Sequence, residues 1–293
     1  MKLLRYGKVG SEKPGIIDSA GKIRDLSNVL ADIDAGTLSD EGLNNIRKID
    51  LQKLPEANDI DRIGCPVANV GKLICIGLNY SDHAKESNMP IPTEPVVFMK
   101  ATSAIIGPND DVLLPAGSKK GDWEVELAVV IGKTARNVSE SNALEHVAGY
   151  TICNDVSERE WQLEHGSQWS KGKSFDTFAP IGPWLVTKDE IKDPHNLPMW
   201  LDLNGRRMQT GNTNTMIFGI EKLISYLSYF VTLNPGDIVS TGTPPGVGMG
   251  IKPEAVYLKA GDQMRVGIDG LGEQQQNVFG GITPAYCYSR TEA

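Results

Sequence analysis

Apolar residues alternate with polar or small residues over much of this chain, and the pattern predicts short strands rather than long helices. From residue 72 onward, strand-like apolar runs follow one another at 72–77, 94–100, 123–132, 147–155 and 236–243. Two other signals stand out: Asn204-Gly205 between strand-like runs predicts a tight hairpin, and the apolar spacing of 220–230 predicts a helix. We therefore expect an α+β fold rich in antiparallel or mixed sheet.

The first part of the chain has a pattern of its own. Residues 3–9 and 15–26 predict short strands joined by glycine turns, and residues 26–49 predict two short helices. A polar stretch at 54–62 follows. We expect a small N-terminal α+β domain over residues 1–65 and a larger catalytic domain over residues 70–285.

Charge and composition exclude several classes of function. The 293 residues include 29 Lys plus Arg and 37 Asp plus Glu, a net charge of -8, without a cluster of basic residues, so nucleic acid is not expected as a partner. The N-terminus lacks a signal-peptide pattern and the sequence lacks an apolar run long enough to span a bilayer, so we expect a cytoplasmic protein that does not bind membranes. The four cysteines form no CxxC pair, which favours buried, reduced thiols.

Two glutamates interrupt the most apolar strand-like run. Glu124 and Glu126 are two residues apart, so on a strand they point to the same side. Two neighbouring carboxylates repel each other and are costly to bury without a cation, which makes a divalent metal a natural partner. The alternative is an edge strand on which both glutamates face solvent.

A strand that ends at Asp155 leads directly into a helix. Ser157 and Glu160 have the spacing of a capping box, which predicts Ser157 as the N-cap. Arg159 and Gln162 then lie three residues apart on one helix face, near Asp155. Taken alone, Asp155 could instead be a turn residue and Arg159 a solvated charge.

A third strand passes through a glycine into a short helix that contains His83 and Glu86. Their i, i+3 spacing places them on one face, and a carboxylate beside an imidazole suits a general base that activates water. The proline-containing segment 87–95 suits a mobile cover. The alternative is a surface ion pair.

Two loops complete the candidate chemistry. Lys173 lies in a short polar run, where its charge could neutralise an anionic substrate, although an exposed lysine is the alternative. Thr243 lies in a glycine- and proline-rich loop, 240–248, whose hydroxyl and backbone N–H groups could bind a carboxylate. This loop lacks the GK[ST] ending of a nucleotide-binding P-loop.

In this order, these motifs resemble the fumarylacetoacetate hydrolase family: GLNYSDHAKE, WEVELAVVIGK, NDVSEREWQ, GKSFDTFAPIGP, MIF and STGTPPGVG. The resemblance extends from about residue 72 to 280. It implies a mixed β-sandwich or β-roll with short helices, assembled as a homodimer, and the N-terminal part resembles the leading domain of bacterial members. One departure is Leu78, where several members carry arginine, so their substrate preferences are not transferred.

The resemblance also implies roles for the candidate residues. Glu124, Glu126 and Asp155 would bind one divalent ion, most often Mg²⁺, with Mn²⁺ or Ca²⁺ as alternatives. Arg159, Gln162 and Thr243 would bind the α-keto acid end of a small oxoacid, with Lys173 near the developing enolate. His83 and Glu86 match the dyad of acylpyruvate-cleaving members.

The expected activity is hydrolytic cleavage of a carbon–carbon bond in a 2,4-diketo acid, including a 2,4-diketo-3-deoxy sugar acid of carbohydrate catabolism. An oxaloacetate decarboxylase, a keto-enol isomerase or a ureidoglycolate lyase on the same metal site are alternatives. A non-catalytic protein that binds metal or an oxoacid is a more distant one.

Overall fold

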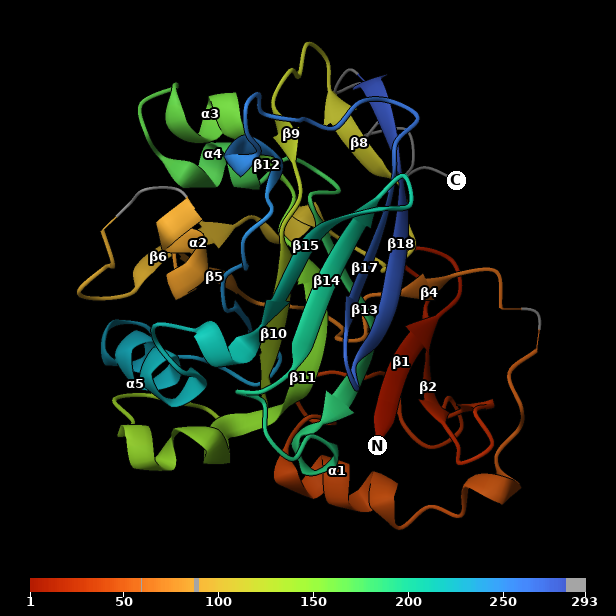
Figure 1. Cartoon of the computed structure of the whole chain (residues 1–293). Helices are drawn as coiled ribbons and strands as arrows, with labels where there is room; N and C mark the ends of the chain where they lie inside the picture. The colour runs from red at the N-terminus through yellow and green to blue at the C-terminus, as the bar shows by residue number, and fades with distance from the viewer. Residues whose placement is uncertain (59, 87–89, 283–293) are drawn as a thin grey trace.

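Two stacked β-sheets form the body of the protein (Figure 1). The computed structural model describes residues 1–58, 60–86 and 90–282. The larger sheet has eleven strands, nine of which follow in the order β3 (Ile23–Asp25), β2 (Lys13–Ile17), β1 (Lys2–Tyr6), β13 (Ala179–Thr187), β11 (Val147–Asn154), β10 (Val125–Ile131), β16 (Ile238–Ser240), β5 (Leu73–Gly77) and β6 (Val96–Lys100). The other two are β4 (Ile63–Gly64), beside β1, and β7 (Ile105–Ile106), beside β13.

The second sheet has five strands and packs over the middle of the first. Its order is β15 (Arg206–Asn212), β14 (Pro198–Leu203), β17 (Gln263–Ile268), β18 (Gly272–Ile282) and β8 (Val112–Pro115). A two-stranded ribbon pairs β9 (Gly121–Asp122) with β12 (Ser157–Glu158). The fold is thus mixed α+β, which confirms the predicted class.

Short helices cover the edges and one end of the sheets (Figure 1). The α-helices in the described residues are α1 (Asp40–Arg47), α2 (Ser81–Glu86), α3 (Arg159–Leu163), α4 (Trp169–Lys173) and α5 (Ile220–Phe230). The 3-10 segments are η1 (Leu51–Lys53), η2 (Thr102–Ala104), η3 (Glu140–His146), η4 (Lys188–Glu190), η5 (Thr213–Thr215) and η6 (Gly248–Gly250). Among these described helices, none is long and apolar enough to cross a membrane.

Strand β10 shows how the sequence pattern produces two cores. Val125, Leu127 and Val129 join the core between the two sheets, together with residues of β14 and β17. Ala128 and Val130 point to the opposite face, where they pack in a second core with residues of β1 and α1. Side chains alternate along a strand, so Glu126 and the preceding Glu124 share the face of Ala128.

Two local predictions are confirmed. Asn204 and Gly205 both have positive φ, 53° and 77°, which is the backbone of a type I′ turn between β14 and β15. Helix α5 covers Ile220–Phe230, the full extent of the predicted helix.

The prediction of two helices in residues 26–49 is wrong, because α1 is the one α-helix there. The Asp34 carboxylate accepts hydrogen bonds from the backbone N–H groups of Gly36 and Thr37, which favours a turn over a first helix. The N-terminal strands are continuous with the large sheet, since β1 pairs with β13. The domain division at residues 65–70 stays a prediction.

The cysteine prediction is confirmed as far as the structure extends. Cys65, Cys75 and Cys153 are free and buried, whereas Cys287 lies outside the described residues.

Candidate active site

The predicted site residues converge on one cavity of about 360 Å³. The cavity lies where β5 turns into α2, beside α3 and α4, and under the loop 243–252. Eight of the nine predicted residues line it: His83, Glu86, Glu124, Glu126, Arg159, Gln162, Lys173 and Thr243. The ninth, Asp155, is fully buried and contacts Lys173 directly beside it.

The pairing of β10 with β11 brings the three acidic residues together. Val125 lies opposite Asn154 in this register, and the Asp155 N–H donates to the Glu124 carbonyl oxygen at 2.8 Å. One carboxylate oxygen each from Glu124, Glu126 and Asp155 lie within 4.8 Å of one another, and all three residues are buried. Three hard oxygen donors at this spacing fit a divalent ion such as Mg²⁺, Mn²⁺ or Ca²⁺.

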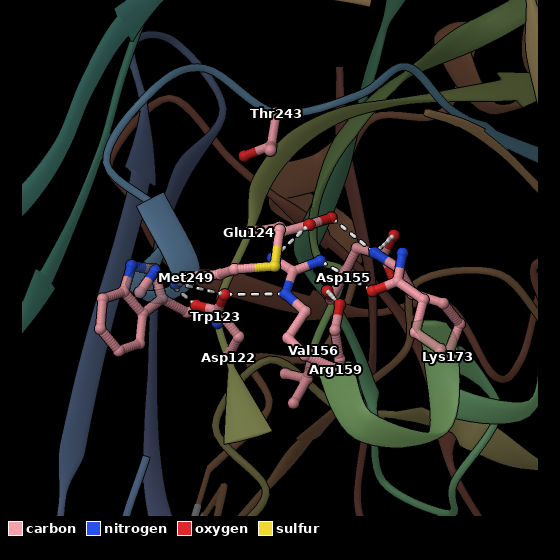
Figure 2. A network of polar contacts seen from close by, with 12 residues as sticks. Asp122, Trp123, Glu124, Asp155, Val156, Arg159, Lys173, Thr243 and Met249 are labelled. Atoms are coloured by element: carbon pink, nitrogen blue, oxygen red, sulfur yellow. Dashed lines mark hydrogen bonds and ion pairs between the residues drawn. The ribbon is translucent and has the colours of Figure 1, made fainter. Parts of the chain in front are cut away.

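Three buried cations surround two of these carboxylates, and Figure 2 labels two of the three, Arg159 and Lys173. Lys173 Nζ lies 2.6 Å from Glu124 Oε2 and 2.7 Å from Asp155 Oδ2. Arg159 Nη2 lies 2.7 Å from Glu124 Oε1, and Lys100 Nζ lies 2.5 Å from Asp155 Oδ1. A metal ion held by these carboxylates would therefore share them with Lys173 or move its ammonium group.

Glu126 has a different environment. Ser240 Oγ and the Gly242 N–H donate to its Oε2 at 2.5 and 3.0 Å, and within the described residues no cationic side chain forms an ion pair with it. Burial, together with the charges of Asp155 and Glu124, raises the pKa of Glu126 well above its ordinary value. A further cation is therefore needed here to favour the ionised carboxylate.

Glu124 shows the opposite shift. Burial alone would raise its pKa, but the charges of Lys173 and Arg159 outweigh burial and lower the pKa to about 2. The same attraction, from Asp155 and Glu124, raises the pKa of Lys173 against the effect of its burial. Both groups therefore stay charged throughout the neutral pH range.

Two members of this network, Lys100 and Asp122, are not predicted from the sequence. Lys100 ends strand β6, and its ammonium also donates to the Val156 carbonyl oxygen at 2.9 Å. Asp122 is fully buried and accepts a hydrogen bond from Arg159 Nε at 2.8 Å. The alternation of Asp122, Glu124 and Glu126 at every second position was a usable signal. A lysine at the end of an apolar strand was a weaker one.

The His83–Glu86 dyad forms as predicted on helix α2. His83 Nδ1 lies 3.1 Å from Glu86 Oε2, and both residues line the cavity. Burial raises the pKa of Glu86, but the hydrogen bonds from His83 and the Gly246 N–H outweigh it, so the pKa is lower than usual. The other three histidines do not line this cavity.

The start of helix α3 differs from the prediction. Ser157 is not the N-cap: its hydroxyl donates to the Asp155 carbonyl oxygen, and it belongs to β12. Glu158 is the N-cap, with its carboxylate accepting from the Trp161 N–H. The longer glutamate reaches the helix from the end of β12 while Ser157 is still in the ribbon. Arg159 and Gln162 nevertheless share one face, with Nη1 and Oε1 2.9 Å apart.

Lys173 and Thr243 are also more constrained than the sequence indicates. Lys173 is not in a loop; it is the last residue of α4 and is 1% exposed. Thr243 lines the cavity, but its hydroxyl donates to the Val125 carbonyl oxygen at 2.9 Å and accepts from Gln209 Nε2 at 2.8 Å. That hydroxyl proton is therefore already used within the protein, and contact of Thr243 with a substrate stays a prediction.

Leu78, the departure noted in the sequence, also lines the cavity. It has φ = 52°, in the left-handed region that is unfavourable for a branched side chain. The turn from β5 to α2 therefore holds Leu78 in a strained backbone conformation next to the dyad.

Comparisons with known proteins agree with this geometry. Residues 72–279 match the model of the fumarylacetoacetate hydrolase C-terminal domain. A Burkholderia cenocepacia protein, whose name gives its assignment as a hydrolase only provisionally, is 61% identical over 277 residues, 94% of this chain and 98% of that protein.

Two solved structures are similar over nearly their whole length. Maleylpyruvate hydrolase from Sphingobium sp. SYK-6, in complex with manganese(II) and pyruvate, is 30% identical with a TM-score of 0.80, covering 96% of this chain and 100% of that one. The 5-carboxymethyl-2-hydroxymuconate delta-isomerase from Mycobacterium smegmatis is 32% identical with a TM-score of 0.76, covering 96% and 99%. The chain therefore belongs to the fumarylacetoacetate hydrolase family.

Proposed function

We propose that this protein is a metal-dependent hydrolase that cleaves a carbon–carbon bond in a 2,4-diketo acid of the acylpyruvate type. The products would be pyruvate and a second carboxylic acid. One observation carries the proposal. A single cavity is lined both by the His83–Glu86 dyad and by carboxylates of the cluster that Glu124, Glu126 and Asp155 form, hereafter the carboxylate cluster. A metal site alone would serve several reactions, whereas a base beside it serves the addition of water.

Glu124, Glu126 and Asp155 would hold the ion, for which we propose Mg²⁺, with Mn²⁺ and Ca²⁺ as alternatives. When bound, a divalent ion supplies a Lewis acid for the keto and carboxylate oxygens of the substrate and for the negative charge that develops there. The related maleylpyruvate hydrolase contains manganese(II) and pyruvate, which supports this choice of site and of product.

The chain's own residues would carry out the proton transfers and the orientation. The dyad takes a proton from water, and the oxygen adds to the distal carbonyl carbon. The bond from that carbon to the middle CH₂ then breaks, and its electron pair forms the enolate of pyruvate, which a proton converts to pyruvate. Arg159 and Gln162 would orient the carboxylate end, and the Lys173 ammonium would stabilise the enolate.

The distal group is the least defined part of the substrate. Leu78, Leu163 and Trp169 give part of the cavity an apolar lining, which favours a short or apolar distal group over a polyhydroxylated one. A 2,4-diketo-3-deoxy sugar acid, and with it a role in carbohydrate catabolism, is therefore the less favoured member of this substrate class.

A second candidate is a reaction on the same metal site without attack by water: a keto-enol isomerase or an oxaloacetate decarboxylase, which pass through an enolate, or a ureidoglycolate lyase, which breaks a C–N bond. The contact of Lys173 with both Glu124 and Asp155 favours the isomerase and the decarboxylase, because this cation and the metal could stabilise an enolate without the addition of water. The isomerase among the related structures supports the same view.

Product analysis in ¹⁸O-labelled water separates the two. The protein would be incubated with Mg²⁺ and, in separate reactions, with acetylpyruvate, oxaloacetate, ureidoglycolate and a 2,4-diketo-3-deoxy acid. We expect pyruvate together with a second acid that carries one ¹⁸O atom. Turnover of oxaloacetate or ureidoglycolate without cleavage of any diketo acid would contradict the hydrolase proposal.

Two further measurements test ligand binding and the oligomeric state. Calorimetry with Mg²⁺ and oxalate, which mimics the pyruvate enolate, separates a binding site from a purely structural acidic cluster. Binding without turnover of any of these substrates would favour a non-catalytic binding protein. Light scattering tests the expected homodimer.

A further inference from the structure

The buried carboxylate of Asp122 contacts two parts of the site that lie far apart in the sequence. Asp122 is fully buried and does not line the cavity. Its Oδ1 accepts hydrogen bonds from the Trp123 and Gly248 N–H groups at 2.8 and 2.6 Å. Its Oδ2 accepts from the Met249 N–H at 3.0 Å and from Arg159 Nε at 2.8 Å. Four donors therefore converge on one side chain.

Through Arg159, Asp122 is linked to the carboxylate cluster. Arg159 lies between Asp122 and Glu124, bound to Asp122 through Nε and to Glu124 through Nη2 (Figure 2). An arginine held at two points of its rigid guanidinium has a fixed orientation. Asp122 therefore orients the group that pairs with a predicted metal ligand.

Through the loop 246–250, Asp122 is also linked to the His83–Glu86 dyad. The loop 246–250, which Asp122 holds at Gly248 and Met249, also donates the Gly246 N–H to Glu86 Oε1 and Oε2 at 3.0 and 3.2 Å. Gly250 lies so close that an added Cβ atom would be 3.0 Å from Glu86 Cδ. The Trp123 indole N–H fastens the same loop by donating to the Gly246 carbonyl oxygen at 3.0 Å. The loop thus fixes the position of the Glu86 carboxylate.

We propose that Asp122 is a positioning residue that sets the dyad at the correct distance from the carboxylate cluster. It does so by holding the loop 246–250 and Arg159 at the same time, without touching the substrate. Only a side chain with two acceptor oxygens can serve all four donors. An asparagine of equal size would turn an N–H₂ group towards at least one of them. The kinetic part of this inference rests on the proposed hydrolase function, whereas its structural part does not.

The test compares Asp122→Asn with Asp237→Asn. Asp237 is a matched control because it is also buried, fastens a loop through the Asn234 N–H and pairs with Lys72, yet lines no part of the cavity. In Asp122→Asn we expect kcat for acetylpyruvate to fall about 100-fold, the effect of a displacement of roughly 1 Å in a catalytic group. The affinity for Mg²⁺ should change far less than kcat. Asp237→Asn should keep the wild-type kcat.

Two NMR signals report the coupling without activity. The Met249 methyl signal, assigned with Met249→Leu, should move in Asp122→Asn but not in Asp237→Asn. The His83 imidazole signal should respond to Mg²⁺ plus oxalate in the wild-type protein and lose that response in Asp122→Asn. If the wild-type protein cleaves no diketo acid, the proposed function fails, and these two signals still decide the coupling.

If Asp122→Asn does not fold, Trp123→Phe takes its place, because it removes one bond to the same loop and leaves Asp122 intact. We expect a smaller fall in kcat with a shift of the Met249 signal. A wild-type kcat in Asp122→Asn, or in Trp123→Phe where that variant is used, would overturn the proposal. So would a His83 signal that still responds to Mg²⁺ plus oxalate.

Discussion

The carboxylate cluster and the His83–Glu86 dyad line the same cavity, but the protein holds them in different ways. The cluster lies at the ends of two paired central strands, and its residues are at most 6% exposed. The dyad lies on the six-residue helix α2, where the Glu86 side chain is 25% exposed and one loop supplies its backbone donor. The fold therefore builds the metal site into the sheet and adds the base from a surface helix.

Within the cluster there is a second contrast. Glu124 and Asp155 have lysine or arginine partners on both oxygens, whereas Glu126 has neutral donors in the described structure. The cations offset the burial of two carboxylates and leave the third dependent on a further charge. This contrast predicts different consequences when each group is changed.

Lys100→Met should have the largest effect on folding. Removal of the ammonium leaves the buried Asp155 carboxylate without the partner at its Oδ1. Loss of one partner of a buried ion pair costs about 3–5 kcal/mol, which urea unfolding would measure as a lower free energy of unfolding.

The matched control for Lys100→Met is Lys222→Met, which removes an exposed pair with Glu140. Exposed pairs contribute about 0–1 kcal/mol. Equal losses in the two variants would show that burial does not strengthen the dependence of Asp155 on Lys100.

Glu126→Gln should remove most of the metal affinity. The amide has nearly the shape of the carboxylate but lacks the charge that a divalent ion requires, so we expect the Kd for Mg²⁺ to rise at least about 100-fold. Calorimetry at neutral pH measures this. A Kd within about threefold of the wild-type value, far below the expected rise of about 100-fold, would show that the ion binds elsewhere.

The same variant tests the pH dependence of stability in metal-free protein. Because the pKa of Glu126 is raised in the folded state, its contribution to stability is present below the ordinary glutamate pKa and is lost as the pH rises through the folded pKa. Glu126→Gln lacks that loss. Its stability relative to wild type should therefore increase between pH 4 and pH 8, as measured by urea unfolding in EDTA; a constant difference would contradict the raised pKa.

The contribution of Glu124 to stability depends on pH in the opposite direction. Its folded pKa of about 2 means that its contribution is present above the ordinary glutamate pKa and is lost as the pH falls towards 2.

Lys252→Met should have the smallest effect, and it concerns the dyad. The charges of His83 and Lys252 both help to lower the pKa of Glu86, after its hydrogen bonds from His83 and Gly246. Removing the Lys252 charge should raise that pKa and move the acidic limb of the pH–rate profile upward. Lys222→Met is the control. An unchanged acidic limb in Lys252→Met would show that Glu86 is not part of the catalytic base.

The sequence was informative where one strand or one helix turn determines the geometry. The period of two along the strand predicts that Glu124 and Glu126 share a face, and the i, i+3 spacing predicts the contact between His83 and Glu86. Similarly, Asn204-Gly205 predicts its hairpin from backbone preferences alone.

Contacts between distant segments were beyond these local patterns. Lys100, at the end of β6, meets Asp155, which follows β11, across 55 residues, and Asp122 meets Gly248 across 126 residues. Ser157 had the correct spacing for a cap, but pairing with Asp122 keeps it in β12 and gives that role to Glu158. Tertiary pairing overrides local preference in each case.

We propose that metal binding and water activation belong to separate groups around one cavity. Calorimetry with Mg²⁺ on Glu124→Gln and His83→Ala, combined with acylpyruvate kinetics, separates the two roles. We expect Glu124→Gln to lose both metal binding and activity, and His83→Ala to bind Mg²⁺ like the wild type and to lose about 100-fold or more in kcat. An active Glu124→Gln protein that binds no metal, or a His83→Ala protein with wild-type kcat, would contradict it.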